Sequence, residues 1–362
     1  MRLATRRRHV FLLILFLVLL VFGFSQVRNK APAETARTPG GNHRRPPIDQ
    51  AILQHNLAHR KAPVKPVSNA TLVVYVYYDG KMTATDGKIR KGWGTHYGFA
   101  HDKTTKKRPT QTDNLEFFLR HGLVSNVDYL FVMNSPTPKG LEIPVLDNVF
   151  VWEKENSCYD LGSFHLGVQH MAAKYKRTYA RYLLVNASVR GPFLPPHGRG
   201  CWTDHFLDHL SDEVKLVGTT WYCETEKRAP PHVQTMVIGM DSIGYDAALP
   251  ALRCPATIHD AIFTGEIPLT GLIEQQGYKV HSLTTAYSAD PEDCQDGDLN
   301  YANRYYGMSF HPYEVVFIKT NRGIDDKALA QYTEWHDKII MRQASSCQYH
   351  IPLRSLTAIS RR

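Results

Sequence analysis

Apolar residues gather in short runs along the chain from Thr71 onward, and segments with helical spacing separate these runs. Runs of this kind, rich in β-branched and aromatic residues, are typical of buried strands. They cover residues 71–78, 128–134, 149–152, 181–186, 214–218 and 233–240. Strands that alternate with helices predict an α/β domain with a largely parallel, mixed sheet.

Three helices are predicted between these strands. The first follows Asp113, a candidate N-cap with Glu116 in the capping-box position, and ends at Gly122. Apolar residues at helical spacing carry the second from Phe164 to Tyr175, and the third covers Gly265 to Gln276. Because ligands bind beyond the carboxyl ends of strands in such sheets, functional side chains are expected just after the strands.

The chain before residue 69 has a different pattern. Residues 10–24 are 15 consecutive apolar positions directly after Arg6–His9, and with residues 25–27 they are long enough to span a thin membrane. We predict a single-pass, type II signal anchor, with a cleaved signal peptide as the alternative. The predicted order is a cytoplasmic tail at 1–9, a signal-anchor transmembrane helix at 10–27, a flexible stem at 28–68, a folded lumenal domain at 69–347 and a C-terminal tail at 348–362.

Charge is distributed unevenly between these parts. Residues 1–68 hold 12 basic and two acidic side chains, a net charge of +10, whereas residues 69–362 hold 31 and 32, a net charge of −1. The basic cluster before the apolar run places the folded part in the lumen by the positive-inside rule. Since the folded part is nearly neutral, it lacks a broad phosphate-binding surface, and no nucleic-acid partner is expected.

Cysteine usage agrees with a secretory compartment. Six cysteines all lie beyond the apolar segment, which predicts up to three disulfides, and the absence of a CxxC pair argues against zinc. Sequons begin at Asn69 and Asn186, and the glycan is expected on Asn69, at the start of the folded part. The predicted location is the Golgi or endoplasmic reticulum membrane. The cysteines are Cys158, Cys201, Cys223, Cys254, Cys294 and Cys347.

Two strand ends carry candidate ligand-binding residues. Asn156 and Asp160 follow the third strand, where they would face the strand ends and bind hydroxyl groups, although Asp160 is equally typical of a helix N-cap. Asn186, Ser188 and Arg190 follow the fourth strand, before a Gly-Pro turn. The alternative for this second place is an ordinary turn or a glycosylated loop.

These segments, together with one near the carboxyl end, resemble a known family. Residues 155–163, Leu184–Pro192 and His311–Lys319 are similar to glycosyltransferases related to rhamnan synthesis protein F, and the resemblance covers about residues 71–322. It implies a GT-A-like, Rossmann-type fold, a nucleotide-sugar donor, and a glycan or glycoconjugate acceptor. Asn156, Asp160, Asn186, Ser188 and Arg190 would then bind the donor.

The resemblance also bears on a metal cofactor, Mn²⁺ or Mg²⁺. Family members often carry an acid where this chain has Ala187, so the acid that would resemble a metal-binding DxD is missing. His311 resembles a late histidine that some GT-A enzymes use as a metal ligand, although a lone histidine before proline is also typical of a structural residue. Asp296-Gly-Asp298 is a literal DxD, but it lies in a loop rich in Pro, Gly and Asp that we expect to be solvated.

Transfer to an acceptor hydroxyl requires a proton acceptor if the reaction inverts the anomeric carbon. Glu266, at the start of the third predicted helix, is the candidate base, and an acid that simply stabilises a helix amino terminus is the alternative. His232 and Gln234, at the start of the sixth strand, are candidates for acceptor contacts or ordinary polar residues at a strand end.

Other patterns leave rival functions open. The basic, Gly-rich segment Lys81–Arg108 either closes over a diphosphate or forms a solvated loop. Within it Lys91–Thr95, and later Gly218–Trp221, hint at the phosphosulfate loop of a sulfotransferase. His205 and His209 lack the glutamate of a zinc protease, and an ordinary helix face is expected for them. The rivals are therefore a lumenal sulfotransferase and a catalytically silent glycan-binding or scaffold protein.

Overall fold

The computed structural model describes residues 70–79, 109–198, 200–224, 229–288 and 297–340. The predicted tail, membrane span and stem, the Asn69 sequon, the basic segment 81–108 and residues 341–362 lie outside this range. Within the described residues, no helix has the length and apolar character needed to cross a membrane.

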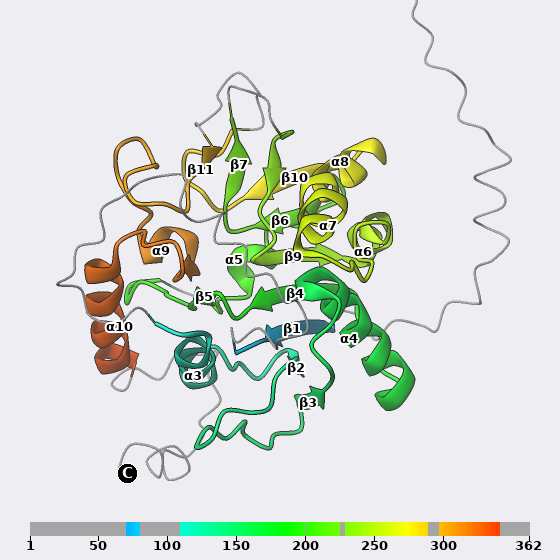
Figure 1. The fold of residues 1–362 in the computed structure, drawn as a ribbon, viewed down its shortest axis with the longest axis horizontal. Coiled ribbons are helices and arrows are strands. Elements are labelled where there is room, and N and C mark those ends of the chain that lie inside the picture. Colours follow the sequence, from blue (N-terminus) through cyan, green and yellow to red (C-terminus); the bar gives the residue numbers. More distant parts are fainter. Residues whose placement is uncertain (1–69, 80–108, 199, 225–228, 289–296, 341–362) are drawn as a thin grey trace, which may run out of the picture. The chain divides into compact units, whose positions relative to one another are not determined.

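Seven strands form one central sheet in the order β10-β6-β9-β4-β1-β2-β3 (Figure 1). Strand β9 runs antiparallel to its neighbours β4 and β6, and the remaining neighbours in the sheet are parallel. The predicted α/β class with a largely parallel, mixed sheet is therefore confirmed. The strands are β1 (Thr71–Tyr77), β2 (Asp128–Met133), β3 (Val149–Glu153), β4 (Arg181–Asn186), β6 (Val214–Gly218), β9 (Val237–Asp241) and β10 (Lys279–Ser282).

Helices cover both faces of this sheet (Figure 1). Side chains alternate along β1: Val73, Tyr75 and Tyr77 pack with α3 (Gln111–His121) and α5 (Asp204–Leu207), because successive residues of a strand point to opposite faces. Leu72, Val74 and Val76 pack on the other face. The helices of that second layer are α4 (Tyr159–Tyr175), α6 (Ser242–Ala248) and α8 (Ile267–Gln275).

A third apolar cluster joins the carboxyl-terminal segments to α3. It contains Phe117, Phe193 and Phe310, and it lies where α9 (Pro312–Val315) and α10 (Asp326–Ile340) pack. Two small antiparallel sheets complete the fold. They are β5 (Val189–Arg190) with β12 (Ile318–Lys319), and β7 (Trp221–Cys223) between β8 (His232–Val233) and β11 (Gly297–Asp298).

Three local predictions need correction. Helix α3 begins one residue after its N-cap Thr110, and Asp113 is the third helical residue of the capping box, where its carboxylate accepts from Thr110 N at 2.6 Å. The predicted stop at Gly122 is confirmed. The expected single strand at 233–240 is interrupted at residues 234–236, and the helix expected from Gly265 begins earlier, with α7 (Ile258–Asp260) and η1 (Ala261–Glu266).

Disulfides tie the domain together, as the cysteine usage predicts. Cys158, at the start of α4, is bonded to Cys254, which follows α6. Cys201 and Cys223 are also disulfide-bonded. Gly162 allows α4 to approach residues 253–254 closely, because a Cβ at this position would lie 2.7 Å from the Arg253 carbonyl oxygen.

Candidate functional site

The site is built around a hydrogen bond between the start of α4 and the end of β4. Asn186 is the last residue of β4, and its Nδ2 donates to Asp160 Oδ2 at 2.9 Å. Asn186 Oδ1 accepts from the Ser188 backbone N–H at 3.0 Å and from Ser188 Oγ at 2.6 Å. Three of the residues predicted to bind the donor therefore lie in one hydrogen-bonded cluster at the carboxyl end of the sheet.

Asp160 does not cap its helix. The N-cap of α4 is Cys158, which has φ 71° and makes no side-chain capping bond, and Tyr159 follows with φ 46°. Two consecutive residues with positive φ are costly for non-glycine residues, and such strain occurs often at functional sites. Because the sharp turn sets the course of the chain into α4, the Asp160 carboxylate faces Asn186 and is free of a capping role.

Lys154 holds the turn before α4 in place. Its Nζ donates to the side-chain oxygen of Asn134, at the end of β2, and to the carbonyl oxygens of Glu155 and Ser157, all at 2.9 Å. Burial lowers the pKa of Lys154. Asn156 lies in the middle of this turn and is exposed, so it is available to a ligand but has no place in the Asp160 cluster.

Glu266 approaches the same place from a different element. It ends η1, whose neighbouring Gly265 packs on α4: a Cβ there would lie 3.3 Å from Leu161 Cδ1. One oxygen of Glu266 accepts from the Thr235 backbone N–H at 3.2 Å. Because α7, η1 and α8 follow one another without a break, Glu266 lies inside a helical stretch and does not stabilise a helix amino terminus. π-Helical turns of this kind are frequent at functional sites.

Lys319 is a member of this cluster that the sequence reasoning did not assign. It lies in β12, opposite Val189 of β5, and the next residue, Thr320, donates its backbone N–H to the Ser188 carbonyl oxygen at 3.0 Å. Its charge acts on Asp160. The one available signal was its place at the end of the 311–319 segment that resembles the glycosyltransferase family.

These charges set the protonation of Asp160. Burial of its carboxylate raises the pKa of Asp160 to about 6, and the negative charge of Glu266 acts in the same direction. Lys319 and the hydrogen bond from Asn186 oppose this increase. The carboxylate is enclosed by protein, although part of the residue still reaches solvent.

Arg190 lies apart from this cluster. Its guanidinium Nε donates to Asn114 Oδ1 at 3.2 Å, Nη1 donates to Thr333 Oγ1 at 3.3 Å, and the group lies over the Phe117 ring. Burial lowers the pKa of Arg190. The side chain therefore points toward α3 and α10, and the structure does not bring it to Asp160.

The two predicted acceptor-binding residues have internal partners. His232 Nδ1 lies 2.8 Å from the Pro230 carbonyl oxygen, and its ring stacks on Tyr222. Gln234 Oε1 accepts from Thr220 Oγ1 at 2.8 Å, and its amide nitrogen donates to Asp298 at 3.2 Å. Both residues are buried, which is typical of polar groups that hold strand ends together.

His311 is the N-cap of α9. Its Nδ1 accepts from the Tyr313 backbone N–H at 3.2 Å, and burial lowers its pKa. No group of three or more Cys, His, Asp or Glu side chains within the described ranges is arranged to hold a metal ion. The Ala187 side chain is buried, so the strand-end position of a DxD acid contributes no ligand. The described side chains therefore do not form a DxD-type metal site, and Asp296 of the Asp296-Gly-Asp298 segment lies outside the described residues.

The second sulfotransferase-like segment has the wrong surroundings for a phosphate loop. Gly218 ends β6, and the chain continues through Thr219 and Thr220 into strand β7. A phosphate loop requires a helix amino terminus directly after the strand, and none follows here. Lys91–Thr95 lies outside the described residues.

Neither a model of a known protein family nor a curated protein sequence matches this chain.

Proposed function

We propose that the protein is a glycosyltransferase of the secretory pathway, with a lumenal GT-A-like domain that moves a sugar from a nucleotide-sugar to a glycan or glycoconjugate. The observation that carries the proposal is the convergence of Asp160, Asn186, Glu266 and Lys319 at one strand end, from segments far apart in the sequence. A largely parallel sheet with one inner antiparallel strand supports the GT-A-like assignment, and the disulfides support an oxidising compartment.

The Asp160–Asn186 pair suits the sugar and ribose hydroxyls of a donor. Asn186 donates to one carboxylate oxygen of Asp160, and within the described ranges the other oxygen accepts no hydrogen bond, so it can accept one from a hydroxyl. Ser188 is partly exposed, and its hydroxyl is held by Asn186. Side chains fixed in this way lose little conformational entropy when a ligand binds.

Glu266 and Lys319 have complementary roles in the proposed reaction. The acceptor hydroxyl gives its proton to the Glu266 carboxylate as its oxygen forms a bond to the anomeric carbon. The bond from that carbon to the phosphate oxygen breaks, and its electron pair leaves with the nucleoside diphosphate. Lys319 is the positive charge beside Asp160 that stabilises the departing diphosphate.

We propose that Lys319 performs the charge-stabilising role that an acid at position 187 and its metal ion would otherwise share. Two features support this view: Ala187 offers no ligand, and β12 brings Lys319 alongside Ser188–Val189. Lys319→Met should then weaken donor binding, whereas Lys279→Met, which removes an exposed lysine of an unrelated ion pair, should not. Donor binding in EDTA equal to that in Mn²⁺ or Mg²⁺ is expected, and a strict metal requirement would contradict the role of Lys319.

The proposed function is tested by thermal stabilisation of the full-length protein. UDP-, GDP- and dTDP-sugars are each added, with Mn²⁺ or with EDTA, and adenosine 3′,5′-bisphosphate serves as the sulfotransferase probe. We expect one nucleotide-sugar to raise the melting temperature of the wild type, and to raise that of Asn186→Ala by less at the same concentration. Stabilisation by the bisphosphate alone would establish the sulfotransferase alternative, and no response to any nucleotide would favour a silent glycan-binding protein.

A further inference from the structure

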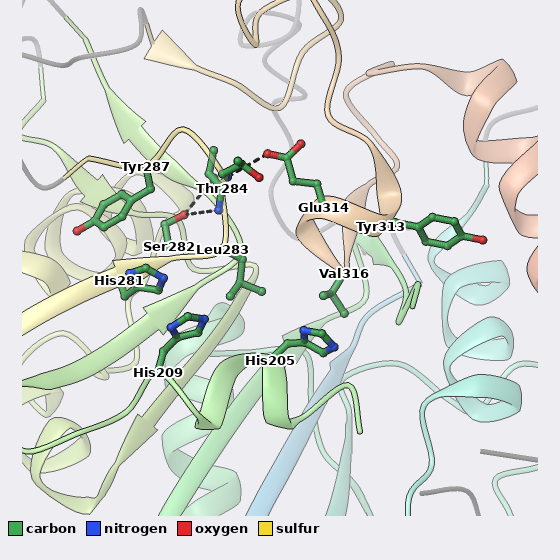
Figure 2. A pocket seen from close by; sticks show the side chains of 11 residues that line it. His205, His209, His281, Ser282, Leu283, Thr284, Tyr287, Tyr313, Glu314 and Val316 are labelled. Atoms are coloured by element: carbon green, nitrogen blue, oxygen red, sulfur yellow. Dashed lines mark hydrogen bonds between the residues drawn. The ribbon is translucent and has the colours of Figure 1, made fainter. Parts of the chain in front are cut away.

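A cavity of about 320 Å³ lies at the carboxyl ends of the strands, on the same side of the sheet as Asn186 but next to β10. Figure 2 shows three imidazole rings facing it, His205 and His209 from the α5 region and His281 from β10. Ser282 ends β10 and pairs with Gly218 of β6, and β9 and then β4 follow β6 in the order of the sheet. Ser282 and the end of β4 are therefore three strand spacings apart, about 14 Å. We call this space the histidine cavity.

The three imidazoles have no hydrogen-bonding partner among the residues that the structure describes. Neither ring nitrogen of His205, His209 or His281 hydrogen-bonds another side chain or backbone group in the described part of the chain. In His165, by contrast, Nδ1 lies 2.6 Å from the Tyr245 hydroxyl and Nε2 lies 2.9 Å from the Gln169 side-chain nitrogen. The ring nitrogens of the three cavity histidines are therefore free to hydrogen-bond water or a ligand that enters the cavity.

The charges of the cavity favour a neutral ligand. Burial lowers the pKa of His205 and His281, so these rings are uncharged at neutral pH. Glu314 adds a carboxylate to the lining of the cavity, where one of its oxygens accepts from Thr285 N at 3.0 Å. An anion would meet this negative charge without a compensating cation among the side chains that line the cavity.

The shape and chemistry of the lining suit a sugar ring. A neutral imidazole offers one donor and one acceptor, which matches hydroxyl groups that do both. The His209 and His281 rings stack on each other with centroids 4.2 Å apart, and Tyr287 stands edge-on to His281, so only the outer surface of this aromatic group is available to the apolar face of a pyranose. The volume is at the lower end of ligand pockets, ~300–1,000 Å³, and suits a single sugar unit better than a whole nucleotide-sugar.

We propose that the histidine cavity binds a neutral sugar unit of the acceptor glycan. The identification of this sugar as an acceptor rests on the proposed function, whereas its binding to the cavity can be measured by itself. We define the proposed donor cluster as the group formed by Asp160, Asn186, Ser188, Glu266 and Lys319. The chain from α9 into β12 connects the two places, because Val316 lines the cavity and Lys319 lies in the donor cluster.

The test is saturation-transfer NMR on the full-length protein, with methyl glycosides of neutral hexoses and pentoses and with methyl glucuronide as the anionic probe. We expect a neutral glycoside to bind and the glucuronide to bind more weakly. His209→Ala and His281→Gln should each weaken the neutral glycoside about tenfold, as expected for lost hydrogen bonds. His209 is exposed, so its replacement does not endanger the fold. His259→Ala, on the exposed helix α7, is the matched control and should change nothing.

Three results would overturn the proposal: no glycoside bound, preferential binding of the glucuronide, or equal binding by wild type, His209→Ala and His281→Gln. Thermal stabilisation by the nucleotide-sugar, measured on the same variants, should remain at the wild-type level. If no nucleotide-sugar binds at all but the neutral glycoside still binds through these histidines, the proposed function fails and the sugar site stands.

Discussion

Burial and neighbouring charges perturb single side chains of the proposed donor cluster. Asp160 is the clearest case, because its carboxylate is enclosed, shares a site with Glu266 and has a pKa near 6. Asn186, by contrast, is hydrogen-bonded on both sides of its amide. Its nitrogen donates to Asp160 and its oxygen accepts from Ser188. A ligand hydroxyl that replaces the lost hydration of Asp160 would recover part of its desolvation cost.

The raised pKa of Asp160 gives a prediction about pH. The folded chain binds the proton more tightly than the unfolded chain, whose aspartate has the ordinary value of 3.8, so this group favours the folded state increasingly as the pH falls from 7 through 6 toward 4. Asp160→Asn, which can still accept from Asn186, should raise the free energy of unfolding at pH 7 by about 1–3 kcal/mol and by much less near pH 4. Urea unfolding at both pH values measures this difference. A loss of stability at pH 7 would show that the buried, charged carboxylate does not destabilise the folded state. Asp212→Asn, at an exposed aspartate, is the control.

Arg190 is predicted to have a structural role. Its buried guanidinium donates to Asn114 and Thr333, and lysine cannot reproduce this planar arrangement. We expect Arg190→Lys to lower the free energy of unfolding by about 1–3 kcal/mol and to leave donor affinity unchanged. Titration of the donor into the folded variant separates the two effects, with the exposed Arg253→Lys as control. A stable variant that has lost donor binding would return Arg190 to the site.

At the scale of elements, the site depends on how three connections are made. The Cys158–Cys254 bond, the turn held by Lys154, and the pairing of β12 with β5 bring α4 and Lys319 to the end of β4. The disulfide, the turn and the β12–β5 pairing lie outside the regular alternation of strands and helices. They position the charged groups, whereas the core residues stabilise the sheet.

The disulfide prediction follows from this role. The bond closes a loop with a sequence separation of 96, and the loss of such a cross-link costs about 2–5 kcal/mol in the chain-entropy account. Cys158→Ser together with Cys254→Ser should lower the melting temperature and weaken donor binding, because Asp160 lies two residues from the bond. Differential scanning calorimetry and donor titration measure the two effects. A double variant with wild-type stability would contradict the first, and unchanged affinity the second.

Six of the seven strands of the central sheet were predictable because each coincides with a short apolar run, whereas β10 has a single apolar residue among its four and was not predicted. The strand-end rule placed Asp160, Asn186 and Ser188 correctly in one cluster. The same rule misplaced Arg190. A turn at Ala187–Ser188 separates β4 from β5, so the two-residue parity of a strand does not continue across it. Lys319 could not be found from local pattern, because its position depends on pairing between segments about 130 residues apart.

At the scale of the whole molecule, the proposed donor cluster lies at the carboxyl end of β4 and the histidine cavity at the carboxyl end of β10, on the same side of the central sheet. This arrangement would place a donor near Asp160 and a sugar unit of the acceptor near the end of β10. The predicted anchor and stem would hold such a domain at the lumenal side of a membrane, near glycan substrates.

Glycan occupancy tests this placement. Asn186 is buried and donates to Asp160, so an attached oligosaccharide is incompatible with its position, whereas the Asn69 sequon should be used if the domain is lumenal. Glycopeptide mass spectrometry of the full-length protein from a eukaryotic host is expected to find a glycan on Asn69 and none on Asn186. A glycan on Asn186 would refute the donor cluster, and an unmodified Asn69 would argue against a lumenal domain.

The central claim is that the end of β4 binds a nucleotide-sugar. Its most direct test is calorimetric titration of the donor identified by thermal stabilisation into the full-length wild type, Asn186→Ala and the control Lys279→Met. Loss of the buried amide should weaken affinity by about 1–3 kcal/mol, roughly 5- to 150-fold, while the control binds as the wild type does. Equal affinity in wild type and a folded Asn186→Ala would show that the donor, if it binds, binds elsewhere.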